Sequence, residues 1–274
     1  MSKTQTPFSA LFTILCFLLF LHNNVKSDSF SFNFPNFAPA QDLGLAFFGD
    51  ARPLGGVIQL TRRDETNGTV TFRPHSVGRA VYILPLQLWD NLTGKLASFE
   101  TEFRFVVDSA GSEIHGDGLS FFITPFNAEP NIPENSDGGY LGLLSRETAF
   151  NTYMNKIVAV EFDSFRNDWD PNPVKIGPHV GIDINSIESE KYIEWPINRV
   201  PQRSIGKVVV KYDSKVKELS ARLRYVEPVV DFTLTLPIDL STILPEFVRI
   251  GFSGATGDMV ESHDILSWSF KLHI

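Results

Sequence analysis

Apolar and polar residues alternate along most of this 274-residue chain, and no amphipathic stretch of helical period lasts three turns. In residues 99–107, for example, phenylalanines at positions 99, 103 and 105 alternate with charged residues at positions 100, 102 and 104. A strand with this pattern buries one face and leaves the other face in water. The chain therefore predicts two sheets that bury their apolar faces against each other.

Clusters of turn-forming residues divide these segments at 64–68, 131–139 and 167–173. Only residues 239–244 could form a short helical turn, and no linker or internal repeat separates two units. We therefore predict an all-β fold, a single antiparallel β-sandwich of the jelly-roll type with ten or more strands. The clearest predicted strands are 30–34, 99–107, 119–124, 157–163, 180–184, 207–212, 219–224, 230–236, 248–252 and 266–272.

The first 27 residues have the pattern of a signal peptide. Lys3 precedes an apolar run at 11–21, and Val25-Lys26-Ser27 marks the expected cleavage site. The run is shorter than the roughly 20 residues that span a bilayer as a helix, and no second run of that length follows. We expect residues 1–27 to be removed, residues 28–274 to form the mature domain, and its destination to be the cell exterior or a vacuole, with no membrane span.

Composition limits how the mature chain can be stabilised and which partners it can bind. Cys16 is the only cysteine and lies in the predicted signal peptide, so the mature chain would depend on a large apolar core instead of disulfides. The sequons Asn67-Gly68-Thr69 and Asn91-Leu92-Thr93 predict glycosylation at Asn67 and Asn91. A net charge of -8 argues against a nucleic-acid partner.

Residues 158–186 concentrate the side chains that can bind a metal. Glu161 and Asp163 lie two apart in a predicted strand, so both project from one face while Phe162 points into the opposite layer. Two carboxylates this close remain ionised when a cation lies between or beside them. The additional ligand types that follow in the sequence are Asn167, Asp170 and His179.

Two ions suit this set of side chains. Calcium takes about six to eight oxygen ligands from carboxylates, amides, main-chain carbonyls and water. An octahedral ion such as manganese accepts carboxylates together with one imidazole nitrogen. The other interpretation places Glu161 and Asp163 on a solvated sheet face, with His179 as an ordinary loop histidine. The Asp-Trp-Asp-Pro turn, which returns Asp170 toward the strand, favours the metal site.

Long motifs throughout the mature chain resemble those of the legume lectins, in the order found in that family. The resemblance implies a metal-dependent sandwich that binds glycans and glycoproteins and has no enzymatic activity. The motifs are SFSFNF, GDGLSFFITP, SDGGYLGLL, VAVEFDSF with NDWDP, HVGIDINSI, LPEFVRIGFSGATG and SHDILSWSF.

The resemblance also implies the ligands of two neighbouring ions. Ca²⁺ would be held by Asp163, the carbonyl of Phe165, Asn167 and Asp170. Mn²⁺ would be held by Glu161, Asp163, Asp170 and His179, with the two aspartates bridging the ions. Ser189 resembles a residue that steadies a manganese-bound water. Nine positions separate Asp170 from His179, which lengthens the loop between them relative to the family pattern.

A sugar offers vicinal hydroxyls and a face of C–H groups, so its receptor needs an acceptor, donors and an aromatic surface. By resemblance, Asp117 accepts from two hydroxyls after a cis Gly116–Asp117 peptide. Asn167 donates its amide N–H to the sugar while its oxygen faces calcium. Gly139 contributes a main-chain N–H, and Phe165 stacks under the ring.

The loop 254–260 is expected to determine sugar specificity. It is short, as in mannose- and glucose-binding relatives, and Asp258 and Met259 would contribute main-chain N–H groups. A galactose-, GalNAc- or complex-glycan-specific lectin remains an alternative. The resemblance further implies a homodimer or homotetramer built on one sheet, with 30–34 as a pairing edge.

Two other classes of protein remain open. Laminarinase-like hydrolases share this architecture and place two glutamates around an aspartate on one strand. This chain has Glu161 and Asp163, but Ser164, Phe165 and Arg166 supply no second carboxylate. The other class is a degenerate lectin-like storage or defence protein, in which metal ligands or sugar loops are lost.

Overall fold

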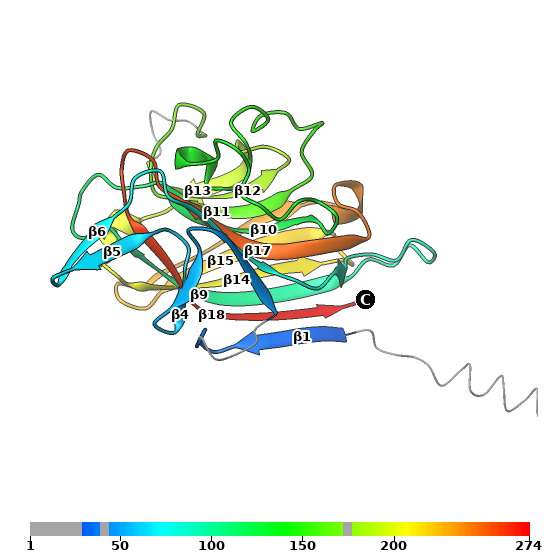
Figure 1. The fold of residues 1–274 in the computed structure, drawn as a ribbon. Helices are drawn as coiled ribbons and strands as arrows, with labels where there is room; N and C mark the ends of the chain where they lie inside the picture. The colour runs from blue at the N-terminus through cyan, green and yellow to red at the C-terminus, as the bar shows by residue number, and fades with distance from the viewer. Residues whose placement is uncertain (1–28, 39–43, 172–176) are drawn as a thin grey trace, which may run out of the picture.

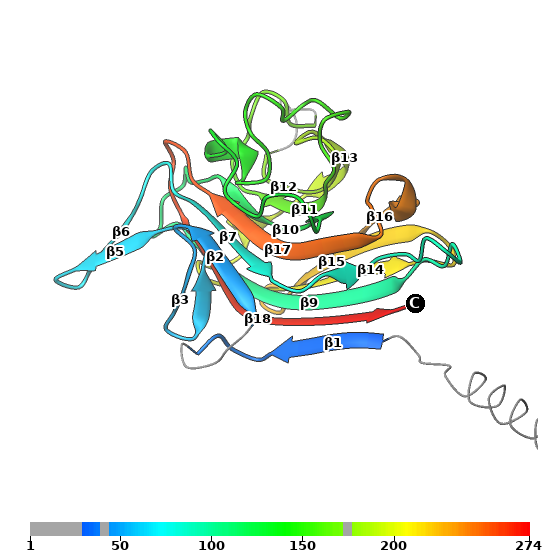
Figure 2. The same ribbon diagram turned by 45° about the vertical axis from the view of Figure 1, so that its right-hand side comes forward.

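The computed structural model of the protein describes residues 29–38, 44–171 and 177–274. Within them, two antiparallel eight-stranded sheets lie face to face, and a two-stranded hairpin projects from the body of the molecule (Figures 1 and 2). This confirms the predicted jelly-roll sandwich. The predicted signal peptide, residues 1–27, lies outside the described residues.

One sheet, which we call the back sheet, contains β1 (Ser29–Phe34), β3 (Arg52–Leu54), β4 (Val57–Gln59), β9 (Ser98–Asp108), β14 (Ile205–Asp213), β15 (Glu218–Tyr225), β16 (Val230–Pro237) and β18 (Ser262–His273). The front sheet contains β2 (Leu45–Gly49), β7 (Val77–Tyr82), β8 (Leu86–Gln87), β10 (Gly118–Pro125), β11 (Val158–Asp163), β12 (His179–Ile184), β13 (Ser189–Glu194) and β17 (Phe247–Ala255). The hairpin is β5 (Arg63–Thr66) and β6 (Thr69–Phe72), and the short 3₁₀ turns are η1 (Gly138–Tyr140), η2 (Ile197–Arg199) and η3 (Leu240–Thr242).

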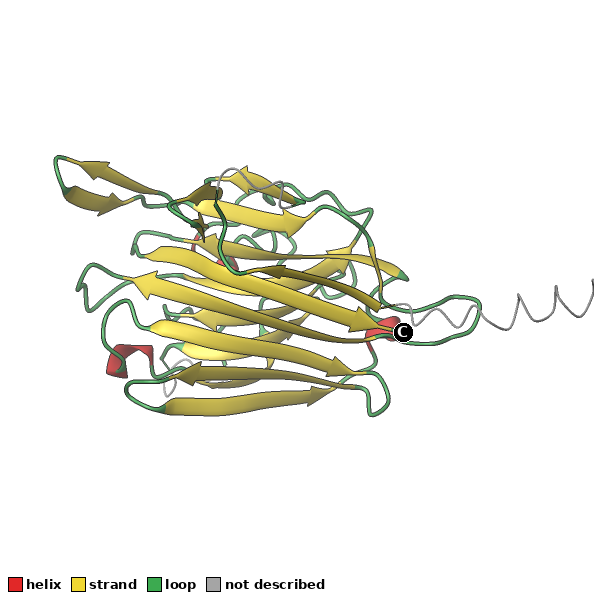
Figure 3. Ribbon diagram, turned by 90° about the horizontal axis from the view of Figure 1, so that it is seen from below, coloured by secondary structure: helices red, strands yellow, loops and turns green. Residues whose placement is uncertain are grey.

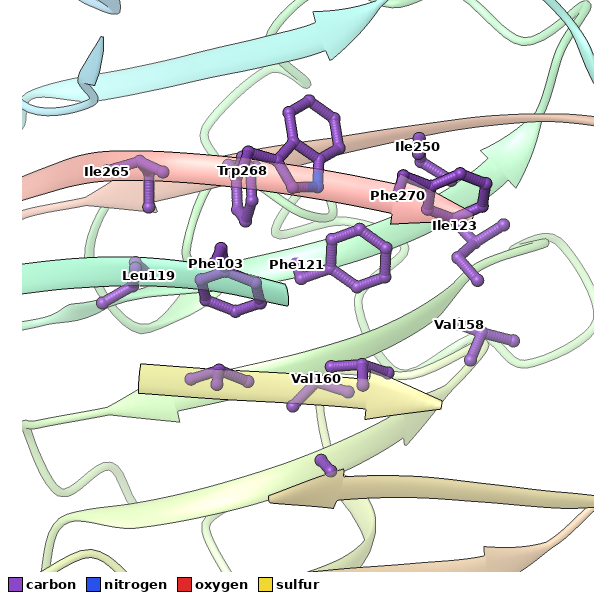
Figure 4. Close-up of a cluster of buried hydrophobic side chains, with 14 of the residues drawn as sticks. Phe103, Leu119, Phe121, Ile123, Val158, Val160, Ile250, Ile265, Trp268 and Phe270 are labelled. Carbon is purple, nitrogen blue, oxygen red and sulfur yellow. The ribbon is translucent and has the colours of Figure 1, made fainter. Parts of the chain in front are cut away.

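Aromatic side chains fill the space between the two sheets. Phe103 of β9 lies edge-on to Phe162 of β11 with ring centroids 6.1 Å apart, and Phe252 contacts Trp268 at 4.7 Å. Figure 4 shows side chains of both sheets, including Phe121 and Trp268, gathered in this layer. Each fully buried large apolar side chain contributes about 1.5–3 kcal/mol, so this core can stabilise the fold without disulfides.

The segment between β10 and β11 forms a second apolar layer over the outer face of the front sheet. Tyr140, Leu141 and Leu143 from this segment pack with Phe122 of β10. In Figure 2 the segment arches over β10, β11 and β12. All six residues of β11 are consequently buried, so polar side chains on the outer face of that strand are removed from water.

β1 lies beside β18 along the edge of the back sheet, as predicted (Figure 1), and Figure 3 shows the molecule from below. Among the described residues it pairs with β18 only, from Ser29 opposite His273 to Phe34 opposite Trp268. The role of this edge in subunit pairing stays a prediction.

All ten predicted strands are present, but the sequence patterns missed β2 to β8 and β13. The predicted turn at 64–68 was wrong in part, because residues 64–66 belong to β5 and only Asn67 and Gly68 form the turn. β5 consists of polar residues only, and Asp64 pairs with Arg62 and Arg73. β6 alternates, but over four residues with only Val70 and Phe72 apolar, which is too short a pattern to identify a strand. The predicted turn at 239–244 contains η3, and η1 and η2 were not predicted.

Candidate functional site

The site lies at one edge of the front sheet, where neighbouring strands bring distant residues together. Gly118 at the start of β10 lies opposite both Asp163 at the end of β11 and Ala255 at the end of β17. Asp163 in turn lies opposite His179 at the start of β12. The loops after β11 and β17 and the loop before β10 therefore meet at this edge.

Glu161, Asp163 and His179 form a compact, buried group. Each offers one oxygen or nitrogen ligand atom, and these atoms all lie within 4.8 Å of one another. The side chains of Glu161 and Asp163 are only 2% exposed, so the interpretation as a solvated sheet face is wrong. Phe162 points the other way, into the core between the sheets, as the strand pattern predicted.

The electrostatics of this group favour a bound cation. Burial raises the pKa of Asp163 well above its usual range, and the negative charges of Asp170 and Glu161 raise it further. Burial also raises the pKa of Asp170 to about 6. The His179 Nε2 lies 3.0 Å from Glu161 Oε1. A divalent cation among these atoms would reverse the penalty for ionising the carboxylates.

Ser189 and Asp183 extend the group toward β13. The Ser189 hydroxyl donates to Glu161 and lies 3.0 Å from Asp183 Oδ1. Asp183 was not predicted from the sequence, although an acid within the apolar strand HVGIDI was a signal for it. Asp183 is 1% exposed, its Oδ2 has no hydrogen-bond partner in the described structure, and burial raises its pKa well above the usual range.

The residues proposed for calcium lie in the loop that follows β11. Phe165 donates its main-chain N–H to Asp163 at 2.8 Å, and Asn167 donates its own to Asp170 at 2.6 Å. The side-chain oxygen of Asn167 is buried without a hydrogen-bond partner among the described residues. Carboxylates together with an unpaired amide oxygen form a donor set that suits calcium. Most of the lengthened loop before His179 lies outside the described residues.

Asp117 lies beside this loop, after a cis Gly116–Asp117 peptide, as predicted. Its N–H donates to the carbonyl of Ala255, and its own carbonyl accepts from the N–H and hydroxyl of Ser164. Asp117 Oδ2 is buried without a hydrogen-bond partner in the described structure. Burial and the nearby charge of Glu261 raise the Asp117 pKa to about 7.

Two glycines allow the loops to approach closely. A Cβ added at Gly116 would lie 2.6 Å from the Cβ of Phe165, so the aromatic side chain packs directly on this backbone. A Cβ at Gly139 would lie 2.6 Å from Cγ of Asn167 and would displace its amide. Asp258 and Met259 lie farther out on the rim, and both are exposed.

A buried network behind the Asp117 loop was also missed, because its members come from distant segments. Glu261 is fully buried and contacts His115 at 2.5 Å, His263 at 2.8 Å and the hydroxyl of Ser164. Burial acts to raise the pKa of Glu261, but hydrogen bonds from the two histidines outweigh it and hold the pKa at about 2. Because Ser164 also donates to the Asp117 carbonyl, this network supports the Asp117 loop.

Replacing Glu261 is expected to destabilise the fold strongly. Glu261→Ala leaves two buried imidazoles without their acceptor and should lower the free energy of unfolding by about 3–5 kcal/mol.

The depressed pKa of Glu261 also predicts a pH dependence of stability. The stabilisation by Glu261 is present above its unfolded pKa and is lost as the pH falls toward 2. Urea unfolding at pH 7 and pH 3 measures both effects. Glu100→Ala, at an exposed position, should change stability by less than about 0.5 kcal/mol, and an equal loss in both variants would contradict the assignment.

Comparisons with known proteins agree with this architecture. The chain matches the family model of the legume lectin domain over residues 29–273. It is 50% identical to Lectin 8 of Medicago truncatula over 274 residues, covering 99% of this chain and 96% of that protein. The metal-free form of lectin I-B4 from Griffonia simplicifolia superposes with a TM-score of 0.79 at 36% identity, covering 89% of this chain and 100% of that chain. The Bauhinia forficata lectin in complex with GalNAc gives a TM-score of 0.78 at 40% identity, covering 89% of this chain and 98% of that chain.

The fold and these relatives define a carbohydrate-binding protein, a lectin. The chain belongs to the legume lectin family, which confirms the family predicted from its motifs. Among the described residues, none of the helices has the length and hydropathy of a transmembrane segment.

Proposed function

We propose that this protein is a calcium- and manganese-dependent lectin that binds a monosaccharide unit of a glycan at the rim formed by Asp117, Gly139 and Asn167. The observation that carries the proposal is a pair of buried oxygens without hydrogen-bond partners, Asp117 Oδ2 and Asn167 Oδ1, in two loops that meet at this rim. Leaving buried polar atoms unpaired is costly, so both positions suit atoms that accept bonds from a bound group.

The donor sets fit two ions. Calcium would take Asp163, the carbonyl of Phe165, Asn167 and Asp170, and manganese would take Glu161, Asp163, Asp170 and His179, with Ser189 beside Glu161. When bound, the ions supply positive charge that keeps these buried carboxylates ionised. Because the Asn167 oxygen would face calcium, its N–H groups would be directed at the sugar.

The rim also offers what a pyranose ring requires. Asp117 would accept from two hydroxyls, Asn167 and the Gly139 main chain would donate, and Phe165 would pack against the C–H face. Phe165 is half-buried, which leaves part of its ring free for this contact. Asp258 and Met259 would add main-chain N–H groups from the loop after β17.

Gly139→Ala should weaken glycan binding about tenfold or more, because the added methyl group displaces the Asn167 amide. Titration calorimetry with the best ligand measures the loss. Gly177→Ala provides a control, since a Cβ there meets no atom of the described residues within 4 Å. Unchanged affinity in Gly139→Ala would show that the Asn167 amide is not part of the sugar site.

For specificity we propose mannose or glucose, because the loop 254–260 is short. Galactose or GalNAc is the second candidate, and the Bauhinia forficata lectin, whose structure contains GalNAc, favours it. A glycan array in Ca²⁺ and Mn²⁺, followed by competition with each free monosaccharide, separates the two. Competition by mannose or glucose supports the first candidate, and competition only by galactose or GalNAc supports the second. No retention on any glycan would leave a degenerate storage or defence protein.

We further propose that the protein is not an enzyme. Asp163 is followed by Ser164, Phe165 and Arg166. These positions therefore lack the second carboxylate that a retaining hydrolase requires. Turnover of β-glucans that disappears in Glu161→Gln would contradict this.

The remaining proposals concern the protein's assembly and destination. We propose a homodimer or homotetramer formed through the back sheet, a secreted or vacuolar destination after removal of residues 1–27, and glycosylation at Asn67 and Asn91. Both asparagines are exposed in turns, which supports their accessibility to glycosylation.

A further inference from the structure

The loop between β6 and β7 lies against the loop that follows β17. His75 donates its main-chain N–H to the carbonyl of Gly257 at 3.2 Å. Ser76 and Thr256 exchange two further bonds, since the Ser76 N–H donates to the Thr256 hydroxyl at 3.0 Å and the Thr256 N–H donates to the Ser76 carbonyl at 2.9 Å. The Thr256 hydroxyl donates to the carbonyl of Arg73 at 2.7 Å. The backbone of His75 is therefore fixed relative to residues 256–257.

The His75 ring contacts two carboxylates on two different loops. Its Nδ1 lies 2.6 Å from Asp137 Oδ2, and its Nε2 lies 3.3 Å from Asp258 Oδ1. Asp137 directly precedes Gly138 and Gly139, at the start of η1. Asp258 belongs to the loop expected to determine sugar specificity. One imidazole thus joins the two loops that carry the proposed main-chain donors.

We propose that His75 is a positioning residue for the glycan site: its imidazolium form ties the Asp137–Gly139 loop to the Asp258–Met259 loop and strengthens glycan binding at acidic pH. This inference rests on the proposed function, because the main-chain donors it positions belong to that site.

The two carboxylates favour the charged form of the ring. A neutral imidazole has one N–H donor and one acceptor nitrogen, so one of its nitrogens would face a carboxylate without a proton. The imidazolium has a proton on both nitrogens, so it donates to Asp137 through Nδ1 and forms an ion pair with Asp258 through Nε2. The hydrogen bond from Asp137 raises the pKa of His75, and the charges of Asp137 and Asp258 raise it further against the opposing effect of partial burial.

The other charged groups around His75 have partners of their own or lie deeper in the site. Arg73 pairs with Asp64 at 3.4 Å, and Asp50 accepts from the Ser76 hydroxyl at 2.7 Å. Asp117 faces the ring from the loop before β10, and the positive charge of His75 acts to lower the Asp117 pKa. A variant that removes only the imidazole keeps all of these groups in place, but it also removes the charge that lowers the Asp117 pKa.

The contribution of His75 to glycan affinity should decrease as the pH rises. The bridge is present below the pKa of His75 and is lost as the pH rises through it. His75 is 57% exposed on its side chain, so water screens the two contacts and the effect is modest. We expect the affinity of the wild-type protein relative to His75→Gln to fall about two- to fivefold between pH 5.5 and pH 8.5.

The test is calorimetric titration of the best glycan ligand, in saturating Ca²⁺ and Mn²⁺, across this pH range. Wild type and His75→Gln are compared, with His273→Gln as the control, since His273 is exposed at the far end of β18. A wild-type to His75→Gln ratio that falls with pH, together with a constant ratio for His273→Gln, supports the role of His75. Parallel profiles for wild type and His75→Gln would overturn it.

NMR titration of the His75 ring provides a second readout that needs no glycan. The pKa should lie above the ordinary histidine value in the wild type and should fall in Asp137→Asn. A pKa that Asp137→Asn leaves unchanged would overturn the bridge itself. A wild-type protein that binds no glycan but retains the shifted pKa would overturn the proposed function and, with it, the role of His75 in glycan binding, while leaving the bridge in place.

Discussion

Chelation of divalent cations is expected to lower the affinity for glycan by at least about 100-fold at pH 7.5, and Ca²⁺ with Mn²⁺ should restore it. Glu161, Asp163 and Asp170 are buried close together, and burial raises the pKa values of both aspartates. Without cations these carboxylates either repel one another or take up protons, and the Asn167 oxygen keeps no partner. Surface plasmon resonance on an immobilised glycoprotein measures the loss and the recovery.

The same argument predicts how the ions act on stability. Ligand carboxylates must be deprotonated to bind metal, so the increase in Tm on adding the two ions should be larger at pH 7.5 than at pH 5. Calorimetry of the chelated and the reloaded protein measures this difference. Full glycan binding by protein shown to be free of both ions would contradict the metal dependence.

Asp117→Asn is expected to lower glycan affinity by at least about 100-fold with little change in Tm, because it removes a charged acceptor from two hydroxyl hydrogen bonds. The replacement keeps the shape of the side chain, and the main-chain contacts to Ala255 and Ser164 are retained. Removing the buried charge next to Glu261 also relieves a repulsion, so the fold does not depend on it. Titration calorimetry and thermal unfolding give the two quantities.

Asp168→Asn is the matched control, since Asp168 is exposed in the loop that carries Asn167. This variant should bind within about twofold of the wild type, as expected for an exposed carboxylate. If Asp117→Asn retained comparable affinity, the sugar would bind elsewhere on the molecule.

The sequence could predict the strands of the sandwich because each long strand buries one regular face. The ligand types in the sequence and the family resemblance grouped Glu161, Asp163 and His179, and the structure brings them together because the end of β11 lies opposite the start of β12. The burial of these side chains was not predictable from alternation. It depends on the segment between β10 and β11, which covers the outer face of the sheet without a periodic pattern of its own.

Contacts between residues far apart in the chain could not be predicted from the sequence, for a different reason. His115 and Glu261 are separated by 146 positions, and His75 and Asp137 by 62, so no local spacing signals either contact. The short strands of the front sheet and the hairpin had no alternation, or one too short, as in the four residues of β6, to identify a half-buried strand. Asp183 is a single acid within an apolar strand, and this pattern could have indicated a buried polar residue at the site. The same pattern is equally expected where the edge of a sheet faces water.

A crystal structure grown with Ca²⁺, Mn²⁺ and the monosaccharide that best inhibits binding would test the central claim most directly. We expect anomalous scattering from manganese among Glu161, Asp163, Asp170 and His179, calcium beside Asn167, and a sugar with two hydroxyls on Asp117 and one face on Phe165. Ions that bind away from this group, or a sugar that occupies another part of the surface while Asp117 and Asn167 contact only water, would contradict the account.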